Sequence, residues 1–363
     1  MAVGVDCGHR PVRNPDPDPA DEARGADEPR RPLMSNLRTS AFVAALVLTA
    51  FLAASGDPYF MDIFILTCFF GTLAVCWNMM AGLTGLMSLG HPLFVGIGAY
   101  SVAWGASAHG LPPLVTWPLG IALSVAAAAV IGMLCFRYGL RGYFFAIATL
   151  AFNEVAFFAV SASVALGRSD GIILPTSPDD SPFHLQFFER WPYGLIIGTI
   201  LIGVVSAGEL LMRSRTGYYW RALRDNEEAA EALGVHARAY KLWCFMFTAG
   251  VAGLCGSFYA NYVAFVDPRS VLGIDLSVQM LVYSIIGGMS LLWGPLVGAV
   301  ILVPFSVVLR GITPIPGGDL IVYAVLLAVL ALVLPQGIAG WFIARRQRRK
   351  IRRRGDEAPG VAS

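Results

Sequence analysis

A short polar segment at residues 224–234 interrupts a chain that is otherwise mostly apolar. Its residue types predict a helix that Asp225 caps, with Glu228 as the partner in a capping box, and that Gly234 ends. Glu227 and Glu228 fall in the first turn, where the helix dipole favours anions. Such a helix has about two turns and is roughly 12 Å long. We interpret it as a helix that fits a groove on a partner protein, and the alternative is an ordinary solvated loop helix. The candidate residues are Arg224, Asp225, Asn226, Glu227, Glu228, Ala229, Ala230, Glu231 and Gly234.

A second candidate group consists of glycines and polar residues within apolar runs. The run 82–100 carries five glycines that bracket Pro92, so a continuous straight helix is disfavoured there. A weaker echo of this pattern occurs at 288–298, and broken segments in corresponding halves of a chain are typical of a translocation path. Close helix packing is an equally good explanation for the glycines. The candidate path residues are Gly85, Ser88, Gly90, His91, Asn153, Glu154, Gly287 and Gly288.

Glu154 lies near the middle of the apolar run 142–166. A carboxylate at that depth costs about 3 kcal/mol or more unless it faces protein or water. Glu154 is therefore expected either to recognise the ammonium group of a solute or to form a structural pair within the bundle. His91, which precedes Pro92, is expected to satisfy backbone groups freed at a helix break. The alternative for His91 is a gating or titrating role.

The composition indicates a membrane protein. The chain has 363 residues, of which 56% are hydrophobic and only 14% charged, and its mean hydropathy is +0.64. Five of the six cysteines lie in apolar runs and none has C-x-x-C spacing, so they are expected to be small core residues. A phosphate-binding P-loop motif is absent, and the apolar runs contain no catalytic or metal-binding spacing. We therefore expect neither enzymatic activity nor a cofactor.

The apolar runs predict an all-α polytopic bundle with about ten transmembrane helices. The last pair before the C-terminal run is short and closely spaced, so eight helices plus a re-entrant hairpin remain possible. The runs cover about 40–56, 59–80, 86–108, 114–136, 142–166, 191–212, 242–264, 276–292, 295–311 and 319–343.

The distribution of basic residues predicts that both termini are cytoplasmic. With this orientation, 22 of the 26 basic residues lie inside and only Arg168, Arg190, Arg269 and Arg310 lie outside. The predicted regions are a disordered cytoplasmic tail at 1–38, a transmembrane domain at 39–343 and a basic cytoplasmic tail at 344–363. Met34 is an alternative start.

Two segments outside the membrane have further interpretations. The cytoplasmic loop 213–241 contains the polar helix. Eight basic residues within 345–354 are expected to contact anionic lipid as a topology anchor rather than to bind nucleic acid. The acidic outer loop 167–190 is either a docking surface for a binding protein or a simple connector.

Several motifs, in order along the chain, carry a family resemblance. They are GLTGLMSLGHPLFVGIGAY (82–100), LRGYFFAIATLAF (140–152), RTGYYWRALR (215–224), EAAEALG (228–234), GGMSLLWGP (287–295) and LPQG (334–337). The chain resembles the transmembrane subunits of branched-chain amino acid ABC importers of the bacterial inner membrane. In wider importers the EAA motif ends in Ile-x-Leu-Pro, whereas here residues 244–247 read CFMF.

The resemblance implies a multi-helix permease that pairs with a second, homologous permease. Two cytoplasmic ATPase subunits would drive it, and an extracytoplasmic binding protein would deliver the small-molecule solute. Glu228-Ala229-Ala230-x-x-x-Gly234 would be the coupling helix seated in the ATPase groove. ATP binding would close the two ATPases, move these helices together and tilt the attached spans.

Three rival functions remain. The first is an ABC permease for urea, short amides or another small polar solute. The second is a secondary transporter or channel that works without ATPases, which leaves the polar helix unexplained. The third is an intramembrane enzyme, which the lack of catalytic spacing disfavours.

Overall fold

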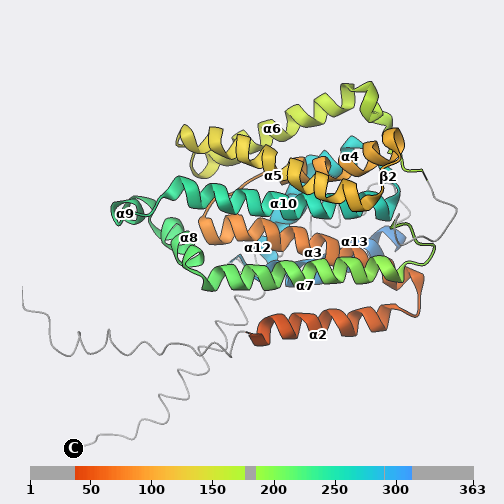
Figure 1. Cartoon of the computed structure of the whole chain (residues 1–363). Helices are drawn as coiled ribbons and strands as arrows, with labels where there is room; N and C mark the ends of the chain where they lie inside the picture. Colours follow the sequence, from red (N-terminus) through yellow and green to blue (C-terminus); the bar gives the residue numbers. More distant parts are fainter. Residues whose placement is uncertain (1–36, 176–184, 290, 313–363) are drawn as a thin grey trace, which may run out of the picture.

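The computed structural model describes residues 37–175, 185–289 and 291–312, and these residues form a helical bundle (Figure 1). The helices are α2 (Leu37–Ala54), α3 (Pro58–Thr84), α4 (His91–His109), α5 (Pro113–Arg137), α6 (Gly142–Ala162), α7 (Trp191–Arg213), α8 (Arg215–Asp225), α9 (Glu227–Ala232), α10 (Ala237–Val263), α11 (Pro268–Leu272), α12 (Ile274–Gly287) and α13 (Gly294–Ile312). Two 3-10 turns, η2 (Val164–Leu166) and η3 (Arg168–Asp170), follow α6. The strands β1 (Ile172–Ile173) and β2 (Phe265–Val266) form a short antiparallel pair.

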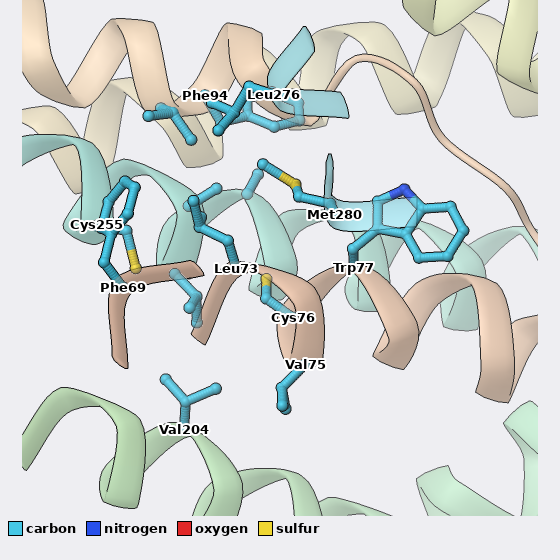
Figure 2. Close-up of a cluster of buried hydrophobic side chains, with 14 of the residues drawn as sticks. Phe69, Leu73, Val75, Cys76, Trp77, Phe94, Val204, Cys255, Leu276 and Met280 are labelled. Atoms are coloured by element: carbon cyan, nitrogen blue, oxygen red, sulfur yellow. The ribbon is translucent and has the colours of Figure 1, made fainter. Parts of the chain in front are cut away.

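Helices α3 and α10 occupy the centre of the bundle. Figure 1 shows α10 between α5 and α3, with α7 on the far side of α3 and α2 at the periphery. Side chains leave α3 in more than one direction: Figure 2 shows Val75 directed towards Val204 of α7, and Leu73 and Cys76 on the opposite side of α3. Leu73, Val75 and Cys76 are completely buried. Apolar residues all round a helix are the pattern of a fully buried element, and α3 has it.

Small residues bring α4, α5 and α10 into close contact. A Cβ added at Gly98 of α4 would meet the carbonyl oxygen of Gly253 on α10, and one added at Gly256 would meet the carbonyl oxygen of Val95. The Ser257 hydroxyl of α10 donates to the Gly98 carbonyl oxygen across 3.2 Å. Glycine and serine at such crossings allow backbones to approach and form interhelical hydrogen bonds in an apolar environment.

The predicted interruptions occur where the glycines lie. Helix α3 ends at Thr84 and is capped by Gly85, which has a left-handed backbone (φ 72°), and α4 begins at His91 with Pro92 in its first turn. Residues 85–90 are not helical, so the predicted run 86–108 is not one continuous helix. Near the other predicted break, α12 ends at Gly287, and Gly288 adopts φ 108° before the turn into α13.

The bundle has two distinct ends. Figure 1 shows α8 and α9 at one end and β2 at the other. At the β2 end, the Tyr262 hydroxyl of α10 donates to Asp62 of α3 (2.8 Å), and Asp62 also forms an ion pair with Arg190. At the other end, the arginine-rich helix α8 follows α7, and the turn between α5 and α6 lies close to α9.

The structure supports the predicted class of membrane helical bundle. Among the described residues, six helices are long and apolar enough to cross a membrane, and one of them is the broken helix of α11 and α12, Pro268–Gly287. The helix predicted over 142–166 is shorter than expected, because α6 ends at Ala162 and 3-10 turns follow. A total of about ten spans and cytoplasmic termini stay predictions, and the tails and the run 319–343 lie outside the described residues. The five described cysteines are buried and free, as predicted.

We predict that Gly98→Ala lowers the melting temperature of the purified protein in detergent. The added Cβ meets the Gly253 carbonyl oxygen, and overpacking of this kind costs about 1–3 kcal/mol. Gly203→Ala in α7 is the matched control, because nothing lies within 4 Å of a Cβ there and alanine stabilises a helix relative to glycine. Equal shifts for the two variants would contradict close packing at Gly98.

Candidate functional site

The polar segment 224–234 forms two elements rather than one helix. Asp225 is the last residue of α8, and α9 comprises only six residues, so it is shorter than predicted. The predicted cap at Asp225 is wrong: Asn226 has an extended backbone, and its side-chain oxygen accepts from the Ala229 N–H across 3.0 Å. The Asp225 carboxylate instead accepts from Arg224. The chain therefore turns at Asn226, where Asn is a preferred cap.

The two faces of α9 do not separate alanines from carboxylates. Ala230 is buried with Leu223 and Ala237, whereas Glu228, Ala229 and Glu231 are exposed. Leu233 follows them and is 86% exposed. Gly234 has φ 89° and ends the element, as predicted. The exposed surface of α9 thus combines carboxylates with small and apolar side chains.

Glu227 points into the protein. Its Oε1 atom lies 2.6 Å from the Lys241 Nζ atom on α10, and its Oε2 atom lies 3.5 Å from the Arg141 Nε atom, which precedes α6. The Lys241 side chain is only 5% exposed and that of Glu227 18%. We call these three residues the inner charge cluster. It ties α9 to the starts of two long helices.

Arg224 connects the polar segment 224–234 with the glycine-containing run 82–100. Its Nη1 atom donates to the Gly82 carbonyl oxygen at the end of α3 across 2.9 Å. A Cβ added at Gly85 would lie 3.2 Å from the Cγ atom of Arg224. The polar segment is therefore in direct contact with the glycine-rich break, although the two are far apart in the sequence.

Side chains from three helices satisfy the backbone of the break at 85–90. The Trp77 indole N–H donates to the Ser88 carbonyl oxygen (2.6 Å), and the Ser277 hydroxyl donates to the Leu89 carbonyl oxygen (2.6 Å). The Leu89 N–H donates to the Thr149 hydroxyl of α6 across 3.2 Å. Within the break, the Gly90 N–H donates to the Ser88 hydroxyl oxygen (3.3 Å). Irregular backbone in an apolar bundle needs such partners.

Other side chains supply the hydrogen bonds expected of His91. Trp77, Ser277 and Thr149 supply the bonds predicted for it, whereas its imidazole nitrogens have no hydrogen-bond partner in the described part of the chain. The ring is buried edge-on against Phe94 and Phe245.

The break also contacts the helix that carries Asn153 and Glu154. Gly90 lies so close to Thr149 of α6 that an added Cβ would meet its backbone. One turn further, the Asn153 amide donates to the Leu272 carbonyl oxygen of α11 (2.9 Å), and Asn153 is completely buried. Glu154 is half-exposed. No ion pair that includes Glu154 occurs among the residues described.

Gly287 and Gly288 belong to a different contact. A Cβ at Gly287 would meet the carbonyl oxygen of Gly294, so this glycine lets α12 and α13 pack closely. The turn that follows is attached to α3 through the Asn78 amide, which donates to the Leu291 carbonyl oxygen (2.9 Å). The structure therefore groups Gly85, Ser88, Gly90, His91 and Asn153 around the start of α4. Trp77 and Asn78, which are adjacent in α3, each hold one of the two breaks.

Sequence reasoning missed several supporting residues, among them Arg141, Lys241, Trp77 and Asn78. Lys241 had a usable signal, because it is one of only two lysines and stands at the start of an apolar run. Arg141 likewise precedes an apolar run. Trp77 and Asn78 lie inside an apolar run, and nothing in their spacing indicates which loop each one holds.

Comparison with known proteins identifies the family of this chain. Residues 59–333 match the family described as "Branched-chain amino acid transport system / permease component". The chain belongs to this family. It is a multi-pass membrane permease component of an ABC transport system, and thus a transport subunit rather than an enzyme.

Curated relatives agree with this assignment. The chain is 27% identical to the high-affinity branched-chain amino acid transport system permease protein LivM of Escherichia coli K12, over 84% of this chain and 76% of the relative. The LivM protein of Salmonella typhimurium LT2 gives the same values. The chain is also 24% identical to the autoinducer 2 import system permease protein LsrC of Salmonella typhi, over 74% of this chain and 76% of that protein. No solved structure matches the chain.

We predict that Asn226→Ala loosens α9, because the Ala229 N–H loses its acceptor. Loss of an N-cap side chain costs about 1 kcal/mol, which corresponds to about fivefold faster amide exchange. Hydrogen–deuterium exchange of residues 227–234 measures this effect. Asp225→Ala is the matched control, and a larger effect of Asp225→Ala would restore the cap predicted from the sequence.

We further predict that Ser277→Ala destabilises the break at 85–90. It leaves the Leu89 carbonyl without its donor, and hydrogen bonds between membrane helices contribute about 0.6–1.7 kcal/mol. Thermal unfolding in detergent measures the loss. Ser101→Ala is the control, because that hydroxyl bonds only within its own helix, to the Ile97 carbonyl. Equal melting temperatures for the two variants would contradict the assigned role.

Proposed function

We propose that the chain is the transmembrane permease subunit of an ATP-driven importer that moves branched-chain or related amino acids across the bacterial inner membrane. The observation that carries this proposal is the contact between Arg224 and the end of α3. Through it, an exposed polar element at one end of the bundle is attached to the interrupted segment inside the bundle. A partner that moves the polar element would therefore move that segment.

The exposed side of α9 supports docking to one of the two cytoplasmic ATPase subunits expected for the importer. Permease subunits of ABC importers work with ATPases and binding proteins in general. Here Glu228 and Glu231 offer charge, and Leu233 offers an apolar contact that is 86% exposed. An exposed leucine that follows two exposed carboxylates suits a groove on another protein better than bulk water.

The translocation path is proposed to run along α4 and α6. Glu154 is half-exposed and lies beside Asn153, whose side chain is buried in the bundle. A carboxylate that faced lipid at this depth would cost about 3 kcal/mol or more. The surface of α6 around Glu154 is therefore proposed to face a second, homologous permease subunit or the water-filled path, where the carboxylate meets the solute ammonium group.

The similarity to LivM supports a branched-chain amino acid as the solute. The similarity to LsrC, an autoinducer 2 import permease, shows that related chains serve other solutes. The alternative is therefore another small polar solute, such as urea or a short amide. An extracytoplasmic binding protein would deliver the solute at the end that carries β1 and β2. Part of the loop 167–190, its proposed contact, lies outside the described residues.

Reconstitution tests the proposed function. The chain is placed in vesicles with two ATPases, a second permease and a binding protein of a branched-chain amino acid importer from the same organism. Uptake of radiolabelled leucine, isoleucine and urea is then followed with and without ATP. We expect ATP-dependent accumulation of a branched-chain amino acid and none without the ATPases. Uphill uptake by the chain without ATPases would instead establish a secondary transporter.

We predict that Glu154→Gln raises the KM for amino acid uptake about tenfold, because a hydrogen bond to a charged group contributes about 1.5–3 kcal/mol. Glu154→Asp keeps the charge and serves as the control. Both variants are first shown to assemble with the ATPases. Unchanged uptake kinetics in Glu154→Gln would exclude Glu154 from solute recognition.

A further inference from the structure

The four acidic residues of the polar segment fall into two groups. Asp225, Glu228 and Glu231 are exposed, and the side chain of Asp225 is 67% accessible. Glu227 is only 18% accessible and is directed away from the surface that a docked ATPase would cover. The most buried carboxylate of the segment therefore has a partner within the chain rather than on another protein.

The burial of this partner, Lys241, is unusual for a lysine. Lys241 is 5% exposed, and its Nζ atom lies 2.6 Å from the Glu227 Oε1 atom. A charged lysine is seldom this buried unless it is paired, because removal of a charge from water is costly. The contact with Arg141 is longer, at 3.5 Å, and Arg141 is half-exposed. Lys241 is thus the stronger of the two attachments.

The inner charge cluster connects three elements that matter for transport. Glu227 is the first residue of α9, Lys241 lies in the second turn of α10, and Arg141 immediately precedes α6. Helix α10 packs extensively on α4 and α5, and α6 carries Asn153 and Glu154. A displacement of α9 would be transmitted to these helices through the ion pairs of Glu227, because the covalent connections on both sides of α9 are turns that can bend.

We infer that Glu227 is a positioning residue that transmits the movement of α9 to α10 and α6 through its ion pairs with Lys241 and Arg141. This inference rests on the proposed function. It assigns Glu227 an inward role, distinct from the ATPase-facing role of Glu228 and Glu231. Loss of the cluster leaves the ATPases bound and able to hydrolyse ATP, but fewer solute molecules cross for each ATP hydrolysed.

The experiment compares single and double variants in the reconstituted complex. Glu227→Gln and Lys241→Met each break the pair, and Glu227→Gln/Lys241→Met removes both charges. Assembly is measured by size-exclusion chromatography, stability by thermal unfolding, and coupling as solute molecules transported per ATP hydrolysed. Arg238→Met is the matched control, because Arg238 is an exposed cation in the same helix start. Glu228→Gln tests whether the exposed face of α9 binds the ATPase.

We expect both single variants to assemble and to transport about 3- to 30-fold less solute per ATP, the range typical of a coupling residue. Arg141→Gln has a smaller effect in the same direction, and Arg238→Met has none. The double variant regains stability, because no uncompensated buried charge remains, but its coupling stays low. Glu228→Gln instead weakens ATPase binding.

Two results would overturn the inference. If the double variant regains wild-type coupling together with stability, the cluster serves only the fold. If Glu227→Gln releases the ATPases as Glu228→Gln does, Glu227 belongs to the docking surface. Failure of the proposed function is recognisable separately, because the wild-type complex itself would then show no ATP-dependent uptake.

Discussion

Backbone groups in an apolar bundle need hydrogen-bond partners, and this requirement organises the interior of the protein. A continuous helix satisfies itself, but residues 85–90 are not helical. Their polar groups are matched by Trp77 from α3, Thr149 from α6 and Ser277 from α12. The break is therefore a fixed junction of several helices. A segment held by side chains from separate elements changes shape when those elements move relative to one another.

Helix α3 is the common support for both breaks. Its adjacent residues Trp77 and Asn78 hold the loop before α4 and the turn before α13, respectively. Near the end of α3, the Gly82 carbonyl oxygen accepts a hydrogen bond from the Arg224 guanidinium group. The described residues thus connect the polar segment at one end of the bundle with both irregular segments through one central helix. Such an arrangement suits a permease, in which an event at the cytoplasmic surface must alter a path through the membrane.

The charges of the polar segment lie on two different surfaces of α9. Carboxylates on the outward face of α9 stay exposed, whereas Glu227 is held by Lys241 and Arg141. In a protein with only 14% charged residues, this buried ion pair attaches α9 to the start of α10. The two faces of α9 therefore differ: one is exposed, and the other forms ion pairs within the chain.

The sequence by itself determined the helical membrane class, the existence of the polar element, its end at Gly234 and the interruption before His91. These features follow from local chemistry, namely hydrophobic run length, glycine conformation and the restrictions of proline. Tertiary structure decided that Asn226 rather than Asp225 caps α9, because Arg224 engages the Asp225 carboxylate while its own position is set by contact with Gly82. It also decided that Thr149, Ser277 and Trp77, rather than His91, satisfy the break. Those partners lie on three different helices, and the distance between helices in space is not written in the spacing of residues along the chain.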